Sequence, residues 1–312
     1  MGKIAFLFTG QGAQKVGMGQ DLYQTQKAAK EVFDRGEKLR LGTLTQCFSS
    51  DQETLTQTSN TQPCLFLMDL ACARALEAYG IRADMAAGFS LGEIAAIAYA
   101  GVLKDEEAFQ LVTLRGIAME ECSKEHPGSM AAVLRLSAQQ VEQLCEQFDE
   151  VYPVNYNCPG QTVVAGTQEA LRNFGEAVKE AGGRALPLAV SGAFHTPYME
   201  KASEKLAAAL SNMNVKAPTL PLISNTTAMP YPADSRKIRA LLSNQASKSV
   251  QFEKSIRYMY ENGVDTFIEV GAGKTLSGLV SKTLAGEDVK ILQVEDATSL
   301  EETLKILEGL EC

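Results

Sequence analysis

The sequence predicts an α/β protein with a mostly parallel sheet, into which a second, smaller domain is inserted. Short apolar runs alternate with helical patterns in the first 127 residues and again after residue 195. Between them, residues 129–190 follow the order strand, helix, strand, strand, helix, strand. With 312 residues, of which 45% are hydrophobic, the chain is long enough to form two unequal domains.

The larger domain is predicted from both ends of the chain. Its first strand, 3–8, leads into a glycine-rich loop that contains Gly10-Gln11-Gly12, and residues 19–40 are predicted to form broken helix. A long amphipathic helix over 62–79 can end at Gly80, and two further helices follow at 91–98 and 105–122. After His195 we expect strands at 220–224, 266–270 and 289–294, and helices at 198–213, 234–243, 252–262, 274–284 and 300–310.

The inserted domain has a more specific pattern. Strands are predicted at 129–136, 151–157, 162–165 and 184–190, with helices at 138–148 and 168–181. This order is the signature of the ferredoxin-like, split βαβ arrangement. We therefore divide the chain into a large domain, 1–127 and 193–312, and an inserted ferredoxin-like domain, 128–192.

Composition and charge argue against several classes of function. A net charge of −9 makes a nucleic-acid-binding surface unexpected, and no apolar stretch approaches the roughly 20 residues of a membrane helix. The apolar run at the N-terminus is too short for a signal peptide. Seven scattered cysteines, including Cys312, indicate reduced thiols and a cytoplasmic location. With two histidines in the chain, a metal site based on histidine is not expected.

Two glycine-rich strings resemble nucleotide-binding motifs but lack essential residues. The loop after the first strand has Lys15 where the third glycine of a dinucleotide fingerprint would fall. The string Gly271-Ala272-Gly273-Lys274-Thr275 resembles the end of a P-loop, yet Ile268 stands where the first glycine is required. Tight loops between strands and helices explain both strings.

The pattern Gly88-x-Ser90-x-Gly92 lies between a predicted strand and a predicted helix. This context is that of a nucleophile elbow, a sharp turn that exposes a serine hydroxyl above the helix N-terminus. The N–H of Leu91 would then be free to face an oxyanion, and the loop Gly10-Gln11-Gly12 could supply a second donor. We predict that Ser90 is a nucleophile.

A nucleophilic serine needs a base, and the two histidines of the chain are the candidates. His126 lies in a polar turn, where a solvated histidine is expected. His195 lies between small residues and Pro197, in a segment suited to crossing a cleft, and we predict that it is the base. No acidic residue lies near it in sequence, so its orienting partner is either a distant carboxylate or a backbone carbonyl.

Seven blocks of the sequence resemble, in content and in order, those of the malonyl-CoA:acyl carrier protein transacylases, the acyltransferases of fatty-acid and polyketide synthesis. The resemblance runs from the first strand to beyond residue 290 and implies an α/β-hydrolase-like large domain. The blocks are Thr9–Gln14, Gly88–Glu93, Arg115-Gly116, Gly128–Val133, Asn155–Gln161, Gly192–His195 and Glu269–Gly273.

The resemblance implies a role for each matching residue. Ser90 and His195 would form a catalytic dyad, with the N–H groups of Gln11 and Leu91 as the oxyanion hole. Arg115 would bind the malonyl carboxylate, and Phe194 belongs to a string similar to that of malonyl-selective members. The main-chain carbonyl of Gln251 would orient His195. The chain departs from many members at Phe89, where they have histidine.

The implied reaction transfers malonyl from malonyl-CoA to the phosphopantetheine thiol of acyl carrier protein through malonyl-Ser90, in fatty-acid biosynthesis. No cofactor or metal is required, and we expect a cytoplasmic monomer that binds neither nucleic acid nor membrane. The alternatives are an acyltransferase serving a polyketide synthase, an acyl hydrolase on the same dyad, and a non-catalytic module that docks carrier proteins. A basic surface made of five residues could bind the carrier; the alternative is that these side chains are simply solvated. The five residues are Lys248, Lys254, Arg257, Lys274 and Lys282.

Overall fold

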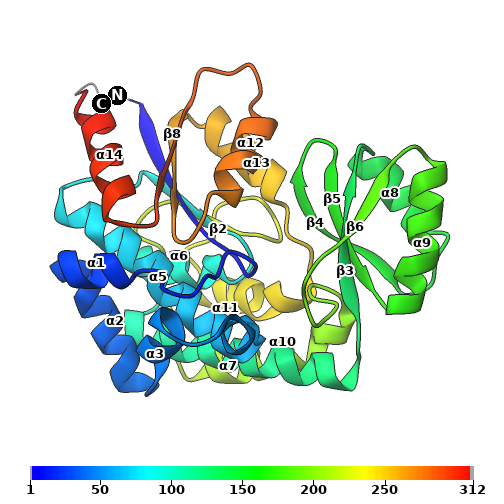
Figure 1. The fold of residues 1–312 in the computed structure, drawn as a ribbon, viewed down its shortest axis with the longest axis horizontal. Coiled ribbons are helices and arrows are strands. Elements are labelled where there is room, and N and C mark those ends of the chain that lie inside the picture. Colours follow the sequence, from blue (N-terminus) through cyan, green and yellow to red (C-terminus); the bar gives the residue numbers. More distant parts are fainter. Residues whose placement is uncertain (1, 310–312) are drawn as a thin grey trace.

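The computed structural model describes residues 2–309 and divides their strands between two sheets (Figure 1). The first sheet has five strands in the order β7-β2-β1-β8-β9, and all of its neighbouring strands run parallel. The second has four strands in the order β4-β5-β3-β6, all antiparallel. An α/β fold with a mostly parallel main sheet and an inserted antiparallel unit, as predicted, is therefore confirmed.

The parallel sheet is covered on both faces, which explains its continuous apolar strands. Along β1, Phe6 and Phe8 join one apolar cluster, whereas Ala5 and Leu7 join a second cluster, because successive side chains point to opposite faces. The strands of this sheet are β1 (Lys3–Phe8), β2 (Met85–Gly88), β7 (Leu222–Ile223), β8 (Val264–Val270) and β9 (Lys290–Val294).

Helices cover the two faces of this sheet. Helices α5 (Thr58–Ala78), α6 (Gly92–Tyr99) and α7 (Asp105–Glu125) supply the first cluster, and α12 (Phe252–Glu261) and α13 (Thr275–Thr283) supply the second. The remaining helices of this part are α1 (Gln20–Thr25), α2 (Lys27–Leu39), α3 (Thr43–Phe48), α4 (Gln52–Thr56), α10 (Glu200–Ser211), α11 (Ser235–Asn244) and α14 (Ala297–Glu308), with short 3₁₀ turns at Pro197–Met199 (η1) and Gln245–Ser247 (η2).

The antiparallel sheet and two helices form a separate subdomain with its own apolar cluster. Ser137 and Thr167 cap its two helices by accepting hydrogen bonds from backbone N–H groups of the first turn. Its elements are β3 (Ser129–Leu134), α8 (Ala138–Cys145), β4 (Val151–Cys158), β5 (Gln161–Gly166), α9 (Gln168–Glu180) and β6 (Arg184–Pro187). This strand order is that of the ferredoxin-like fold; the domain limits at 127/128 and 192/193 stay predictions.

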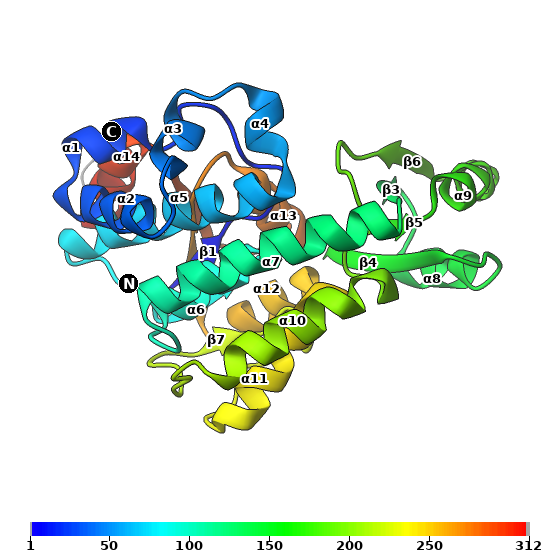
Figure 2. The ribbon, with the colours of Figure 1, turned by 90° about the horizontal axis from the view of Figure 1, so that it is seen from below.

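Two connections fix the subdomain beside the large part. The long helix α7 runs out to the subdomain and α10 lies beside it (Figure 2). Strand β4 is also tied directly to the segment before α12: Tyr156 N–H donates to the Val250 carbonyl, and Val250 N–H donates to the Val154 carbonyl, each at 2.8 Å. These bonds tie strand β4 of the subdomain to the large part.

The structure differs from the sequence prediction in several places. The region 41–57, for which no element was predicted, contains α3 and α4, and α5 begins at Thr58 rather than at residue 62. Pro63 removes one backbone hydrogen bond inside α5, yet the turn before it is largely buried, so packing keeps it helical. Leu310, the predicted last helical residue, and Cys312 lie outside the described residues. Among residues 2–309, no helix is long and apolar enough to cross a membrane.

Candidate active site

Ser90 lies at the corner between β2 and α6, in the strand–turn–helix context that the sequence predicted. Its backbone has φ of +54°, a left-handed conformation that is strained for a serine. A Cβ at Gly88 would lie 2.0 Å from the Gly92 carbonyl carbon, and one at Gly92 would lie 2.3 Å from the Phe8 and Thr9 oxygens. Glycine is therefore required at both flanks because backbone passes there without room for a side chain.

Two side chains from distant segments hold this strained corner. Asn225 accepts a hydrogen bond from Ser90 N–H at 2.7 Å and donates one to the Gly88 carbonyl at 2.6 Å. Gln245 donates from Nε2 to the Ser90 carbonyl at 2.6 Å. Both amides are buried, so these bonds are shielded from competing water.

His195 reaches Ser90 from the segment after the subdomain. Its Nε2 lies 2.8 Å from Ser90 Oγ, and its Nδ1 lies 3.1 Å from the Gln245 carbonyl and 2.9 Å from the Lys248 carbonyl. Because carbonyls only accept hydrogen bonds, this pattern places the proton on Nδ1 and leaves Nε2 free to accept the serine proton. Burial, reinforced by the nearby Arg115 cation, lowers the pKa of His195 to about 4, so the ring is neutral at pH 7.

The orienting group of His195 is not the one predicted. The Gln251 carbonyl instead accepts from the backbone N–H of Ser255 and from its hydroxyl at 3.0 Å, both in the first turn of α12. Because that carbonyl already belongs to the helix, the contacts to His195 come from Gln245, the first residue of η2, and Lys248, which directly follows η2. Of the two alternatives left open by the sequence, a backbone carbonyl is the one found.

Arg115 projects from α7 into the site and is fully buried. Its guanidinium donates to Ser90 Oγ at 3.1 Å, to Gln62 Oε1 at 2.9 Å and, through two nitrogens, to Gln245 Oε1 at 2.8 and 3.2 Å. Burial lowers its pKa to about 10, so it still carries its charge at neutral pH. Among the described residues no carboxylate forms an ion pair with it.

Glu93, in the first turn of α6, is the acidic residue whose charge acts on Arg115. Its Oε1 accepts hydrogen bonds from Asn225 N–H at 2.8 Å and from the Tyr231 hydroxyl at 2.9 Å. Burial raises the pKa of Glu93 to about 7, so near neutral pH it is only partly ionised. It therefore offsets the Arg115 charge only in part.

The N–H groups of Gln11 and Leu91, predicted as the oxyanion hole, make no hydrogen bond to any described residue. The Gln11 side chain is held aside, because its Nε2 donates to Thr58 Oγ1 at 3.2 Å. Leu91 precedes the first turn of α6, where helix N–H groups have no partner within the helix. Both donors are thus available for an anion, as the proposed role requires.

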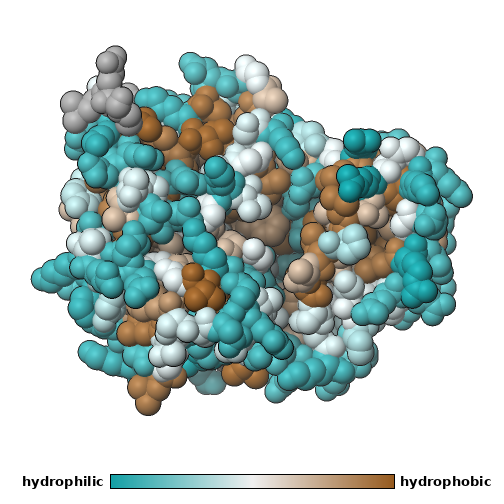
Figure 3. Space-filling model, viewed as in Figure 1, coloured by the Kyte–Doolittle hydropathy of each residue, from teal (hydrophilic) through white to brown (hydrophobic). Residues whose placement is uncertain are grey.

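A cavity of about 230 Å³ lies between the large part and the subdomain, and the space-filling view shows the molecule hollowed there (Figure 3). The large part contributes the Gly10–Ala13 loop, and Phe89, whose ring packs edge-on against Phe252. Phe194, by contrast, is buried in the main apolar cluster. Its expected contact with substrate stays a prediction.

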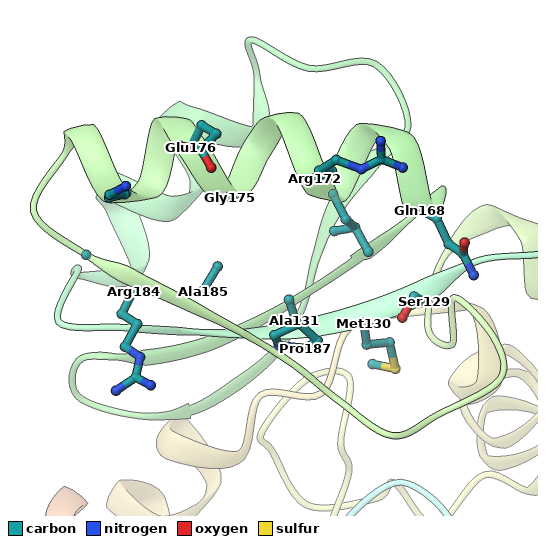
Figure 4. Close-up of a pocket in the computed structure, with 13 residues that line it drawn as sticks. Ser129, Met130, Ala131, Gln168, Arg172, Gly175, Glu176, Arg184, Ala185 and Pro187 are labelled. Carbon is teal, nitrogen blue, oxygen red and sulfur yellow. The ribbon is translucent and has the colours of Figure 1, made fainter.

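A second cavity, of about 460 Å³, lies within the subdomain between α9 and strands β3 and β6 (Figure 4). It is lined by cations such as Arg172 and Arg184 and contains none of the predicted site residues. His126 is exposed at the end of α7, and its ring stacks on Tyr198. Within residues 2–309, no cluster of three or more metal-ligating side chains is present.

Sequence reasoning missed four buried residues of this site. Gln62 and Gln245 hold the Arg115 side chain, Asn225 holds the corner, and Glu93 links α6 to Asn225. Glu93 belongs to the block Gly88–Glu93, whose pattern gives it no role of its own. Asn225 and Gln245 lie 135 and 155 residues from Ser90, in segments without a periodic pattern, and no local signal singled them out.

Comparisons with known proteins show which family the chain is similar to. The family model described as the acyl transferase domain matches residues 5–302. The malonyl CoA-acyl carrier protein transacylase of Bacillus subtilis is 40% identical over 98% of both chains. The crystal structure of the Clostridium perfringens transacylase of the same name covers 98% of both chains with a TM-score of 0.94 and 39% identity.

A further solved structure is a malonyl-transacylase in complex with its type II PKS acyl-carrier protein; it has a TM-score of 0.92, 32% identity and coverage of 98% of this chain and 99% of that one. The dyad, the buried arginine and the full-length matches lead to one assignment. The chain belongs to the malonyl CoA-acyl carrier protein transacylase family of acyl transferase domains.

Proposed function

We propose that this protein transfers the malonyl group from malonyl-CoA to the phosphopantetheine thiol of acyl carrier protein, through a malonyl ester of Ser90, in fatty-acid synthesis. The observation that carries the proposal is the buried Arg115 cation, which donates to Ser90 Oγ and, in the part of the chain that the structure describes, forms no ion pair with a carboxylate. A substrate that brings its own carboxylate next to the serine supplies that partner. Neutral acyl groups leave the cation unpaired.

In the first half of the reaction, Ser90 Oγ attacks the thioester carbonyl while His195 Nε2 takes the hydroxyl proton. The negative charge on the tetrahedral intermediate is received by the N–H groups of Gln11 and Leu91. The intermediate then breaks its carbon–sulfur bond, and His195 returns the proton to the leaving thiolate of coenzyme A. The product is malonyl-Ser90.

In the second half, the carrier thiol attacks malonyl-Ser90 and gives its proton to His195. Collapse of the second tetrahedral intermediate breaks the ester bond, and the proton returns to Ser90 Oγ. The carbonyls of Gln245 and Lys248 keep the imidazole in one orientation and tautomer throughout both halves. The alternative of an acyl hydrolase on the same dyad would use water in place of the carrier thiol, and the full-length match to transacylases favours transfer over hydrolysis.

The decisive experiment incubates the protein with malonyl-CoA and measures the intact mass. We expect the mass to rise by one malonyl group, mapped by peptide analysis to Ser90, and to fall back when holo-carrier is added, with malonyl appearing on the carrier. Ser90→Ala should remove the adduct and keep the fold. An adduct that persists in Ser90→Ala, or free malonate without malonyl-carrier, would contradict the proposal.

Three finer points belong to the same proposal. A cytoplasmic location is supported by the cysteines at positions 47, 64, 72, 122, 145 and 158, none of which is in a disulfide. A monomeric state would be tested by sedimentation of the purified chain. Whether the carrier serves fatty-acid or polyketide synthesis is tested by comparing transfer rates on both kinds of carrier.

A further inference from the structure

Asp69 is an acidic residue in the middle of helix α5, where its neighbours along the chain are apolar. Residues 63–73 are all buried, and among them only Asp69 has a side chain that carries oxygen. Its exposed fraction is 0%, and its Oδ1 accepts a hydrogen bond from Thr9 Oγ1 at 2.6 Å. Within residues 2–309, its Oδ2 has no hydrogen-bond partner. A buried acid that is only half satisfied is costly, so its bond to Thr9 indicates a function.

The surroundings of Asp69 favour its neutral form. Burial raises the pKa of the carboxyl well above its ordinary value; the Thr9 hydrogen bond offsets this rise only in part, and the charge of Glu269 on β8 adds to it. In the neutral acid, Oδ1 is a carbonyl acceptor and Oδ2 carries the proton. Asparagine has the same shape and the same acceptor, with a donor in place of Oδ2, so it is a close mimic of this form.

Thr9 directly follows β1 and begins the glycine-rich loop that contains Gln11. It is 1% exposed and packs between two elements. Its carbonyl oxygen lies against Gly92 at the start of α6, where a Cβ would collide with it. Its hydroxyl lies against Asp69, and the β8–α13 turn closes over both, because a Cβ at Gly271 would collide with Thr9 Oγ1 and Asp69 Oδ1. Thr9 is therefore held between α6 and α5.

This packing sets the spacing of the two proposed oxyanion donors. Leu91 precedes the first turn of α6, whereas Gln11 lies two residues after Thr9, so the two N–H groups belong to different elements. The loop follows the nucleophile corner closely, since a Cβ at Gly10 would lie 2.7 Å from the Phe89 carbonyl oxygen. Oxyanion donors are effective when they are fixed where the negative charge develops. A rotation of Thr9 would move Gln11 relative to Leu91.

We propose that Asp69 is a positioning residue for catalysis, which holds Thr9 through one hydrogen bond and thereby fixes the Gln11 N–H at its working distance from the Leu91 N–H. Asp69 itself touches no substrate. Because the oxyanion exists only in the tetrahedral intermediate and the transition states beside it, losing this bond should lower kcat and leave KM nearly unchanged. The inference rests on the proposed function, in which these two N–H groups receive the oxyanion.

The test compares Thr9→Val, Thr9→Ser, Asp69→Leu and Asp69→Asn with the wild type in malonyl transfer. Since a misplacement of about 1 Å can cost about 100-fold, we expect Thr9→Val and Asp69→Leu to lose at least about 10-fold in kcat, with KM within about 2-fold of the wild-type value. Thr9→Ser and Asp69→Asn keep the hydrogen bond and should stay within about 2-fold of the wild-type kcat. Combining Thr9→Val with Asp69→Leu should cost no more than either change alone, because both act through one bond.

Thr303→Val is the matched control. Thr303, on α14, is 2% exposed and donates from its hydroxyl to the Gln293 carbonyl at 2.9 Å, so this change also removes the hydrogen bond of a buried threonine. Thermal unfolding should show a similar fall in Tm for Thr303→Val and Thr9→Val, whereas only Thr9→Val should lose kcat. A control that loses as much kcat as Thr9→Val, or a wild-type kcat in Thr9→Val, would overturn the inference.

A second measurement does not depend on malonyl-CoA. A fluorophosphonate forms a phosphorus–oxygen bond with Ser90 Oγ and releases fluoride, His195 takes the serine proton, and the phosphoryl oxygen uses the same two donors. Its labelling rate, followed by intact mass, should fall at least about 3-fold in Thr9→Val and Asp69→Leu. A wild type that is labelled but forms no malonyl-Ser90 would overturn only the proposed function. Equal labelling rates in all the proteins would overturn the inference, whatever happens with malonyl-CoA.

Discussion

Arg115 is a buried cation that forms no ion pair with a carboxylate among residues 2–309, although the partly ionised Glu93 acts on its charge. Its hydrogen bonds go to the neutral oxygens of Ser90, Gln62 and Gln245, and these fix the guanidinium plane beside the nucleophile. Removing a charge from water is costly unless an opposite charge compensates for it. On the proposed function, a bound malonyl carboxylate relieves this cost, and the site would then favour an acyl group that carries a free carboxylate.

Replacing Arg115 with alanine should shift the preference from malonyl-CoA toward acetyl-CoA. A hydrogen bond to a charged group contributes roughly 1.5–3 kcal/mol, so losing the guanidinium should cost at least about 10-fold in malonyl transfer. Lysine should not restore it, because an ammonium cannot hold a carboxylate with two parallel bonds. The measurement is kcat/KM for both thioesters. A ratio that stays constant across wild type and both variants would show that Arg115 does not recognise the carboxylate.

The low pKa of His195 gives a testable pH dependence. Burial and the Arg115 charge favour the neutral ring, so its pKa of about 4 lies below the ordinary histidine value of 6.5. Because the unfolded chain binds the proton more readily between these values, stability should decrease as the pH falls from 6.5 toward 4. The acid limb of the rate of malonyl-Ser90 formation should likewise lie below pH 6. A limb centred at 6.5 would contradict this assignment.

His195→Ala should remove most transfer activity, whereas His126→Ala should change it little. The reason is the geometry: His195 Nε2 lies 2.8 Å from Ser90 Oγ, while His126 is exposed and stacks on Tyr198 at the end of α7. Steady-state transfer rates of the two variants, with circular dichroism spectra to verify folding, decide the matter. Similar losses in both proteins would mean that the base is wrongly assigned.

At the scale of elements, the nucleophile corner depends on the meeting of three segments. The β2–α6 turn supplies Ser90, the segment after β7 supplies Asn225, and η2 with its flanks supplies Gln245 and the carbonyls that hold His195. The left-handed conformation of Ser90 persists because these partners occupy both its N–H and its carbonyl.

Asn225→Asp should test this arrangement. An ionised aspartate can still accept from Ser90 N–H but cannot donate to the Gly88 carbonyl, and it adds a charge near the partly ionised Glu93. An unsatisfied buried group costs about 1–3 kcal/mol, so we expect a lower free energy of unfolding by that amount and a reduced kcat. Urea unfolding and transfer kinetics give both values. If the variant is less stable but keeps the wild-type kcat, the hydrogen bonds of Asn225 stabilise the fold without contributing to catalysis.

The sequence could predict what depends on neighbours along the chain. The strand before Ser90, the two glycines and the helix after it form one local pattern, and the strand–helix order of the subdomain is equally local. The partners of Ser90 are not local, since Asn225 and Gln245 reach it only through the folded sheet. The prediction that the Gln251 carbonyl orients His195 was wrong for the same reason. The fold decides which carbonyl between residues 245 and 251 faces the imidazole, and the structure places those of Gln245 and Lys248 there.

At the scale of the whole molecule, the cavity lies between the large part and the subdomain, and the proposed function requires that a carrier dock on the surface near it. The chain is acidic overall, so an acidic carrier needs a local cationic region. The five basic residues predicted for docking are all exposed, but Arg257 is paired with Glu253. Lys254 Nζ lies 5.9 Å from the ring centre of Tyr156 on β4. Lys282 lines a further cavity together with Pro159, which lies in the β4–β5 turn.

Charge reversal at Lys254 and Lys282 should raise KM for holo-carrier several-fold without changing the rate at which malonyl-CoA loads Ser90. The attraction acts between exposed charges, so the wild-type KM should also rise with ionic strength. Lys27→Glu, on an exposed face of α2, is the matched control and should have little effect. If reversal at Arg172 and Lys179 beside the subdomain cavity raises KM instead, the carrier docks on α9 (Figure 4). A carrier KM that is flat with salt would refute electrostatic docking on either surface.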